Sequence, residues 1–139
     1  MSLETAVTNM ATLMSGLADM KRVYSSPPEA LKEFPCAIVY LRDGEFDAFG
    51  GGGRCRATLV LDIYESRTVL AEAVVRSNRW PDRVRTKINT DNSLSGALSH
   101  IGTEEYYFRF RAGAMRYGGA EDIYYGCSFE FPVKVNYAS

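Results

Sequence analysis

Several groups of residues in this 139-residue chain are of types that could support chemistry, and the glycine run Gly50–Gly53 is the first of them. A P-loop needs GxxxxGK[ST] between a strand and a helix, and a dinucleotide site needs GxGxxG at the start of a helix. Here the glycines precede the alternating run RCRATLVLDIYE, and no Lys-Ser or Lys-Thr follows them. Because glycine lowers the cost of unusual backbone angles, the run indicates a hairpin tip and not a phosphate site.

Titratable side chains could support metal or acid–base chemistry at two further places. Asp43, Glu45 and Asp47 alternate just before the glycines and could bind calcium, but the spacing and closing glutamate of an EF-hand are absent. We therefore interpret them as a solvated face of the loop. His100, the only histidine, could act as a general base only beside a nucleophile, and the sequence places none there. No catalytic, cofactor-binding or metal-binding residue is expected, and neither is enzyme activity.

The three cysteines, Cys36, Cys55 and Cys127, are widely spaced and form no CxxC motif. A zinc site needs about four ligands, and these residues do not provide a typical set. Reduced, buried thiols are the simpler interpretation. They favour an intracellular protein, because disulfides form mainly in oxidising compartments.

A basic stripe recurs at spacings of three, four and four, formed by Arg76, Arg79, Arg83 and Lys87. These spacings place the four side chains on one side of a helix, although Pro81 would interrupt it. The stripe is either a solvated helix face or a set of cations that pair with a neighbouring subunit or with phosphates.

Composition limits the classes of function. The chain has 16 basic and 17 acidic residues, a net charge of -1, which argues against a strongly basic nucleic-acid binder and a polybasic membrane binder. Its length favours one domain over residues 1–139. No apolar run approaches the roughly 20 residues of a membrane helix, and no secretory leader is recognisable, so a soluble protein is expected.

The elements that must position these residues are readable from apolar periodicity. In the first half, apolar residues over positions 3–17 predict a helix of about five turns. The run CAIVYL, residues 36–41, predicts a buried strand, and the polar residues 43–53 predict a hairpin arm or loop. Residues 55–64 alternate strictly enough to predict a second strand with Cys55 and Ile63 on the same face.

The second half predicts two helices and two strands. One helix is expected from Thr68 to about Asn78, and a shorter one from Pro81 to about Ile88. The apolar residues expected to face inward on the first helix are Val69, Leu70, Ala73 and Val74. Residues 106–111 predict a strand, and residues 113–122 a turn. From Ile123 to Tyr137 every second residue is apolar, which predicts a long strand in which Pro132 marks an edge or a bulge.

The order of these elements predicts an α+β fold. We expect a mainly antiparallel sheet of about four or more strands, with helices packed on one face and a protruding glycine-rich hairpin. No internal repeat or linker divides the chain.

Four segments together resemble the tail terminator proteins of long-tailed (siphovirus-type) bacteriophages. RVYSSPPEALKEFPCAIVYLRDGEFD is similar to the opening of these proteins, and LVLDIYESRTVLAEAVVRSNRWPDRV to their central strand and the following helix. DNSLSGALSHIG resembles a characteristic loop, and YGGAEDIYYGCSFEFPVKV the terminal hairpin. The resemblance covers nearly the whole chain, although each motif is loose and none is catalytic.

The resemblance implies a virion structural protein of the phage tail, assembled in the host cytoplasm. Such proteins form a homo-oligomeric ring, a hexamer, that caps the tail tube, ends tube polymerisation and provides the head-tail joining surface. The implied partners are other copies of the chain, the major tail tube protein and the head-tail connector protein, with no membrane. DNA would pass through the ring without sequence-specific binding.

The family has no fixed functional residues, so the interface is our own prediction from the chain. It comprises the acidic arm and the basic stripe: Asp43, Glu45, Phe46, Asp47, Phe49, Arg76, Arg79, Arg83 and Lys87. We expect the stripe to pair with acidic groups of an adjoining subunit or the tube, because a dense basic channel would hold phosphates and slow DNA ejection.

Two alternatives remain at this point. One is another phage neck or tail-completion protein, which would also be structural. The other is a small α+β ligand-binding domain or enzyme, which should have a cleft with clustered titratable groups.

Overall fold

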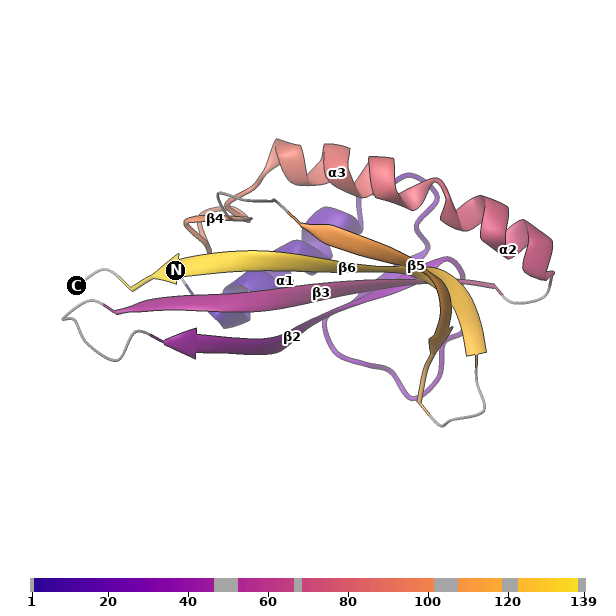
Figure 1. Ribbon diagram of the computed structural model, residues 1–139, viewed down its shortest axis with the longest axis horizontal. Helices are drawn as coiled ribbons and strands as arrows, with labels where there is room; N and C mark the ends of the chain where they lie inside the picture. The colour runs from indigo at the N-terminus through magenta and orange to yellow at the C-terminus, as the bar shows by residue number, and fades with distance from the viewer. Residues whose placement is uncertain (1, 47–52, 67–68, 102–107, 119–122, 138–139) are drawn as a thin grey trace.

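A computed structural model describes the chain except for residues 1, 47–52, 67–68, 102–107, 119–122 and 138–139. The described elements are α1 (Leu3–Met14), β1 (Arg22–Tyr24), β2 (Cys36–Phe46), β3 (Arg54–Glu65), α2 (Leu70–Ser77), α3 (Trp80–Thr90), β4 (His100–Ile101), β5 (Arg109–Arg116) and β6 (Ile123–Asn136). Figure 1 shows the three long strands β2, β3 and β6 running side by side along the molecule.

The strands form one six-stranded sheet in the order β1-β2-β3-β6-β4, with β5 also paired to β6. Only the short β1–β2 pair is parallel, and the remaining pairs are antiparallel. The predicted α+β fold with a mainly antiparallel sheet is therefore confirmed. The short β1 was missed, because its three residues lie in a segment whose prolines and serines indicated irregular structure.

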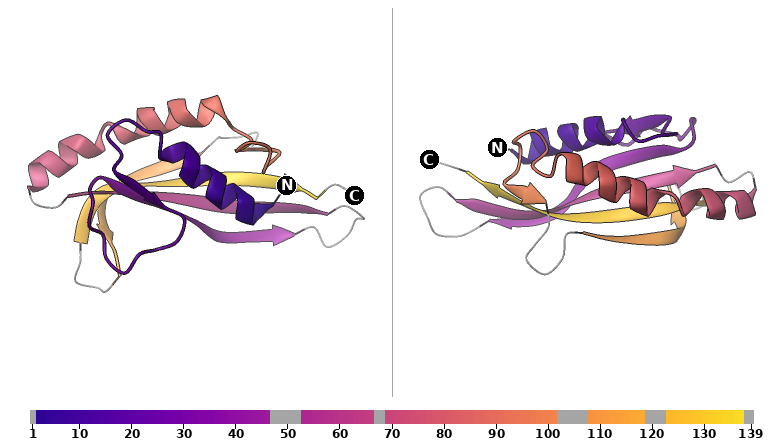
Figure 2. Two further views of the ribbon diagram at one scale, coloured as in Figure 1. Left: turned by 180° about the vertical axis from the view of Figure 1, so that it is seen from behind. Right: turned by 90° about the horizontal axis from the view of Figure 1, so that it is seen from above.

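The main core lies between the helices and one face of the sheet. Odd-numbered residues of β3 and β6, from Cys55 to Ile63 and from Cys127 to Val135, are buried against α1 and α3. α2 packs on this face as well, where the Cys127 thiol donates a hydrogen bond to the Ser77 carbonyl at 3.3 Å. Figure 2 shows the helices along the sheet from two further directions. The prediction that helices cover one face is confirmed, and we call this the core face.

Within the described residues, the opposite face, which we call the open face, is covered only at one end. There a smaller cluster contains Cys36, Ile38, Tyr64 and Met115, beneath the segment that precedes β2. The Tyr64 ring lies edge-on to Tyr117 and Tyr124, with centroids 5.7 and 5.8 Å away. The remainder of this face carries mostly polar residues, such as Arg56, Ser128 and Lys134.

The helix ends follow local sequence signals. The Ser2 hydroxyl accepts a hydrogen bond from the Thr5 amide at 3.0 Å and caps α1, and Pro81 lies in the first turn of α3. α1 ends at Met14, earlier than the apolar stripe indicated, although Leu17 beyond it is still buried. The prediction that Val69 and Leu70 face inward at the start of α2 is wrong.

Val69 and Leu70 are instead 45% and 66% exposed. They lie at the start of a helix of eight residues, and only its later residues Ala73 and Ser77 are buried. The reason is that α2 meets the sheet only near its C-terminal end, where Ser77 contacts Cys127.

The strand expected at residues 106–111 is displaced toward the C-terminus. β5 spans Arg109–Arg116, so it includes four residues that were predicted as a turn. Gly113 lies opposite Gly126 of β6, and a Cβ atom at Gly126 would lie 1.8 Å from the Ile63 carbonyl oxygen. Glycine has a low strand propensity, so the sequence did not predict that β5 continues through this stretch. The strands β3, β5 and β6 approach one another closely there.

Pro132 occupies a local edge within the central strand β6. On one side it lies opposite Thr58 of β3. On the other side, β5 pairs with β6 only as far as Glu130, and β4 pairs with it from Val133 onward. Within the described residues, Pro132 therefore falls between the two partner strands, where its missing N–H costs no ladder hydrogen bond.

Candidate interaction surface

The hairpin of β2 and β3, which we call the arm, has an exposed outer strand β2, whereas its inner strand β3 is paired with β6 and buried on the core face as far as Cys55. The strands pair from Cys36 opposite Tyr64 to Phe46 opposite Cys55, and residues 40–46 of β2 are all exposed. Phe46 is 70% exposed and keeps only a tilted contact with Tyr137, at 6.2 Å between ring centroids. Of the predicted arm residues Asp43, Glu45 and Phe46 therefore lie at its surface. Asp47, Phe49 and the glycine-rich tip lie outside the described residues.

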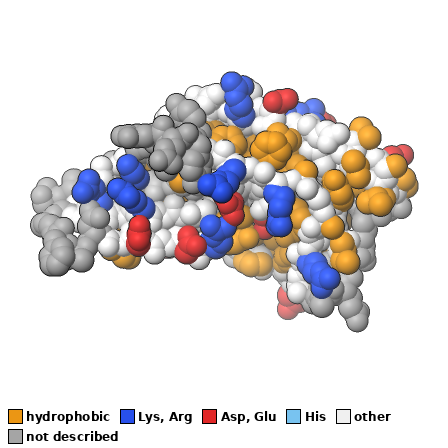
Figure 3. Space-filling view, viewed as in Figure 1, with side chains coloured by type: hydrophobic (Ala, Val, Ile, Leu, Met, Phe, Trp, Pro, Cys, Tyr) orange, Lys and Arg blue, Asp and Glu red, His pale blue; other side chains and the backbone are white. Residues whose placement is uncertain are grey.

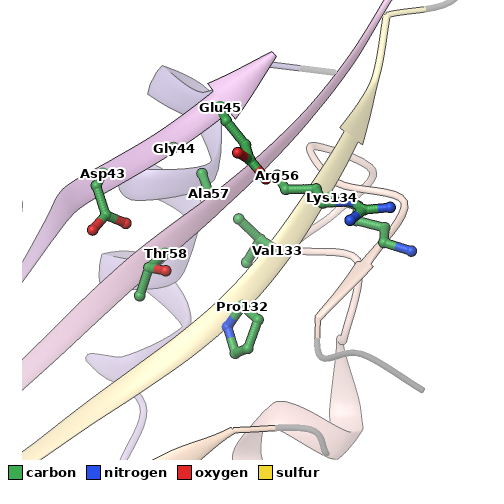
Figure 4. A pocket seen from close by; sticks show the side chains of 9 residues that line it. All are labelled: Asp43, Gly44, Glu45, Arg56, Ala57, Thr58, Pro132, Val133 and Lys134. Carbon is green, nitrogen blue, oxygen red and sulfur yellow. The ribbon is translucent and has the colours of Figure 1, made fainter. Parts of the chain in front are cut away.

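A shallow hollow of about 420 Å³ lies across β2, β3 and β6 on the open face. Figure 4 shows Asp43 and Glu45 on β2, with Arg56 of β3 and Lys134 of β6 extending next to each other. Glu45, Arg56 and Lys134 are direct neighbours in register across the three strands. An acidic edge thus adjoins a basic row. Arg56 and Lys134 were missed in the sequence, although the even-numbered alternation of β3 and β6 placed both on the polar face.

All three arginines of the basic stripe have acidic partners within the chain, and two of them share Asp19. Arg83 Nη1 donates to Asp19 Oδ2 at 2.8 Å and to the Ala18 carbonyl at 3.0 Å. The Arg83 hydrogen bond is the main reason that the pKa of Asp19 lies below its usual value. Arg79 Nη1 lies 3.5 Å from the same Asp19 oxygen. The stripe is therefore anchored to the loop that follows α1.

Glu65, at the end of β3, is the second acidic partner of the stripe, and its carboxylate is buried. Its side chain is 1% exposed and accepts hydrogen bonds from Trp80 Nε1 at 2.9 Å and Arg79 Nη2 at 3.2 Å. Arg76 Nε lies 3.5 Å from the other Glu65 oxygen, and Arg76 also pairs with the exposed Glu72. The Arg79 guanidinium stacks 4.6 Å above the Trp80 ring.

Arg76, Arg79 and Arg83 form ion pairs that connect the helices α2 and α3 to the end of β3 and to the loop after α1. Lys87 lies against Gly16, where an added Cβ would be 2.7 Å from its Nζ, and so places a cation near the C-terminal end of α1. The partners Asp19 and Glu65 were not found from the sequence. Pairing of the stripe with another subunit stays a prediction.

A polar network lies on the open face between the arm and the smaller cluster. The Tyr40 hydroxyl donates to Asp62 Oδ2 at 3.0 Å, and Arg42 pairs with Glu130 across β3. Burial raises the pKa of Asp62, although the Ser128 and Tyr40 hydroxyls oppose this shift. Burial also raises the pKa of Tyr40 to about 12. Figure 3 shows basic and acidic side chains interspersed along this face.

Apolar side chains are exposed on α2 and β5 as well as on the arm. Leu70 and Val75 of α2 are 66% and 68% exposed, and Phe110 of β5 is 54% exposed. Phe110 lines a pocket of about 450 Å³ with Phe108, Pro81 and Arg85. Phe108, Phe110 and Pro81 thus form a small apolar surface beside Arg85.

The remaining candidate groups show no arrangement for chemistry in the described residues. The three cysteines are buried and free, and burial raises the pKa of Cys36 to about 12 and that of Cys127 to about 11. Among the described side chains, no group of three or more His, Cys, Asp or Glu could hold a metal ion. His100 lies in β4, but its side chain is not described. None of the described helices is long and apolar enough to cross a membrane.

No protein-family model and no curated protein matches this chain. The surface therefore has to be interpreted from its own chemistry. Its features are the exposed outer strand of the arm with Phe46, an open face of mixed charge, and exposed apolar side chains on α2 and β5. Each of these is suited to contact with macromolecules more than to the enclosure of a small substrate.

Proposed function

We propose that the chain is a phage tail terminator, a structural subunit that forms a homo-oligomeric ring on the end of the tail tube. The ring would stop tube polymerisation and provide the surface that the head-tail connector joins. The subunit count of six comes from the resemblance of the sequence to this family. No catalytic step and no cofactor form part of this proposal.

The observation that carries the proposal is the arm. Residues 40–46 of β2 form an exposed outer edge of the sheet, and Phe46 at the end of this stretch is 70% exposed. Exposing a phenylalanine in water is unfavourable by roughly 1.5–3 kcal/mol relative to full burial. A partner that covers Phe46 recovers this free energy, so the arm is suited to insert into another subunit or the tube.

The charge pattern supports a ring that DNA can traverse. Along the open face, the Arg42 guanidinium is matched by Glu130, and Asp62 lies close enough to Arg111 for that arginine to lower its pKa. Interspersed charges bind phosphates less strongly than a continuous basic surface, because fewer cations are free to replace counterions. The open face is therefore compatible with DNA that passes without being held.

A tube-length assay tests this function. The major tail tube protein is polymerised with and without the chain, and tube lengths are measured by negative-stain microscopy. We expect added chain to shorten the tubes at a substoichiometric ratio, because one ring per tube is enough to stop growth. Unchanged length distributions at every ratio would refute the proposal.

Two variants with similar exposure test the role of the arm. Phe46→Ala removes a side chain that is 70% exposed, and Val75→Ala removes one on α2 that is 68% exposed. Neither substitution removes a buried contact of the core, so both subunits should fold. We expect Phe46→Ala to weaken capping and Val75→Ala to retain it.

A further inference from the structure

The sheet has an open edge along the arm. β1 covers β2 only at Cys36–Ile38, and within the described residues no strand pairs with the outer side of residues 40–46. An uncovered edge presents backbone N–H and C=O groups to any strand that approaches. This edge is regular after a single register shift between Leu41 and Asp43. It can therefore accept another strand along residues 40–46, with an irregularity at the register shift.

The strand β5 forms a second open edge of the same sheet, on the side of β6 that faces away from β2 and β3. β5 pairs with β6 on one side, and in the described part of the chain no strand lies on its other side. Its residues on the core face, Phe110, Ala112 and Ala114, are exposed, whereas the β6 residues Phe129 and Cys127 opposite the first two are buried. β5 thus has both an open edge and an uncovered apolar side.

The two edges differ in charge. β5 carries Arg109, Arg111 and Arg116 and no acidic residue, whereas the exposed stretch of β2 carries Asp43 and Glu45. The exposed stretch of β2 also carries one cation, Arg42, which pairs with Glu130. The arginines of β5 have contacts within the chain as well, and Arg111 lies near Asp62. Like charges disfavour pairing of an edge with its own copy, and opposite charges favour pairing of β5 with β2. The pattern therefore selects a head-to-tail contact.

Strand direction and stagger are also compatible. Three successive antiparallel pairs separate β2 from β5, so β5 runs opposite to β2 of an equally oriented neighbour. Along the strand direction, β5 lies beside residues 123–130 of β6. The exposed residues 40–46 of β2 lie at the height of residues 130–135 of β6. A neighbour must therefore shift by about six residues, or roughly 20 Å along the strands.

This stagger determines how the strands incline in a closed assembly. Four strands per copy at about 4.8 Å spacing give a width of roughly 19 Å. A shift of roughly 20 Å over that width inclines the strands by about 45°, at the upper end of the range for closed barrels. The shift can thus be absorbed by strand tilt, and a head-to-tail contact can close into a ring.

We propose that copies of this chain join by antiparallel pairing of β5 in one copy with the outer edge of β2, residues 40–46, in the next. The contact covers Phe110, Ala112 and Ala114 and brings arginines of β5 beside Asp43 and Glu45. This inference rests on the proposed ring, whose subunit contact it specifies.

Cross-linking between engineered cysteines tests the contact. Glu45 and Arg111 both point to the open face, since they lie opposite Arg56 and Ser128. A chain with Glu45→Cys and Arg111→Cys is oxidised mildly in the presence of tail tubes. We expect a ladder of covalent multimers on a non-reducing gel that ends at the closed ring. The native chain, whose three cysteines are buried, provides the background.

Matched controls identify the face and the direction of pairing. Phe46→Cys with Arg111→Cys places the thiols on opposite faces, because Phe46 lies opposite Cys55 of the core face, and should cross-link at least about tenfold less. Chains that carry only one engineered cysteine should give no dimer, since each edge meets a different edge. Dimers from Glu45→Cys alone would overturn the head-to-tail contact.

The outcomes separate this inference from the proposed function. Rings that cap tubes without a Glu45–Arg111 cross-link would overturn the edge contact and leave the terminator function standing. A ladder without an upper limit and without tube capping would support the edge contact and refute the function. Cross-linking of the arm cysteine to the tube protein, in place of another copy, would also overturn the inference.

Discussion

At the residue scale, Asp62 is a nearly buried carboxylate with an incomplete set of hydrogen bonds. Its side chain is nearly buried in the middle of the open face, and Oδ1 has no hydrogen-bond partner among the described atoms, whereas Oδ2 accepts from Tyr40. A buried carboxylate oxygen without a partner costs free energy when the group is ionised. Burial accordingly raises the pKa of Asp62 above its usual value of 3.8.

The sign of the pH dependence follows from this raised pKa. The folded state favours protonated Asp62 more than the unfolded state does, so the contribution to stability is present below the unfolded pKa. It is lost as the pH rises through the folded pKa. Asp62→Asn remains neutral and can still accept the Tyr40 hydrogen bond. We expect it to be more stable than the native chain by about 1 kcal/mol near neutral pH, with a smaller difference in acid.

Urea unfolding of both chains from about pH 3 to about pH 7 measures this difference. Asp43→Asn is the control, because the Asp43 side chain is 64% exposed and should change stability little. A native chain that is as stable as Asp62→Asn near neutral pH would contradict the account.

At the scale of elements, the arginines of α2 and α3 hold the helices to the sheet. Glu65 at the end of β3 contacts Trp80 and Arg79 of the α2–α3 unit, and Asp19 ties Arg83 to the loop after α1. The sequence predicted the stripe but not its partners. Asp19 and Glu65 lie 64 and 14 residues from Arg83 and Arg79, and helical spacing carries no information on contacts over such separations.

Two glutamates that both pair with Arg76 test whether this fastening stabilises the fold. Glu65 is 1% exposed and Glu72 is 64% exposed. Glu65→Gln removes the charge that faces two arginines inside the protein and should lower the free energy of unfolding by about 1–3 kcal/mol. Glu72→Gln removes an exposed pair and should change it by less than about 0.5 kcal/mol. Thermal unfolding measures both, and equal effects would show that burial of Glu65 does not matter.

The accuracy of the predicted elements depended on how strongly one face is buried. β6 was predictable in full because residues such as Cys127 and Phe131 are buried at every second position. β5 was misplaced because Ala112 and Ala114 are exposed, so its sequence carries no buried alternation. Leu70 was wrongly expected to face inward because it is apolar, although its side chain is exposed in the structure. The predicted arm residues Asp43, Glu45 and Phe46 do lie at the surface, and their role at an interface stays a prediction.

At the scale of the whole molecule, the fold provides a packed body and an exposed outer strand, residues 40–46 of β2. The body is stabilised by the core between α1, α3 and the sheet. Residues 40–46 of β2 and the strand β5 lie at opposite edges of the sheet. Two different contact surfaces on opposite sides generate a head-to-tail assembly, which closes into a ring when the rotation permits. A ring with an arm on each subunit is suited to seat on the end of a tube.

The location and number of subunits on tail tubes test this account most directly. A copy of the chain with a visible tag is mixed with polymerised tail tube protein, and the tags at the ends and along the walls are counted by electron microscopy. We expect a ring of six tags at one end of each tube and none along the walls. Tags spread along the walls, or tubes without tags at either end, would contradict the claim that this chain is a tail terminator.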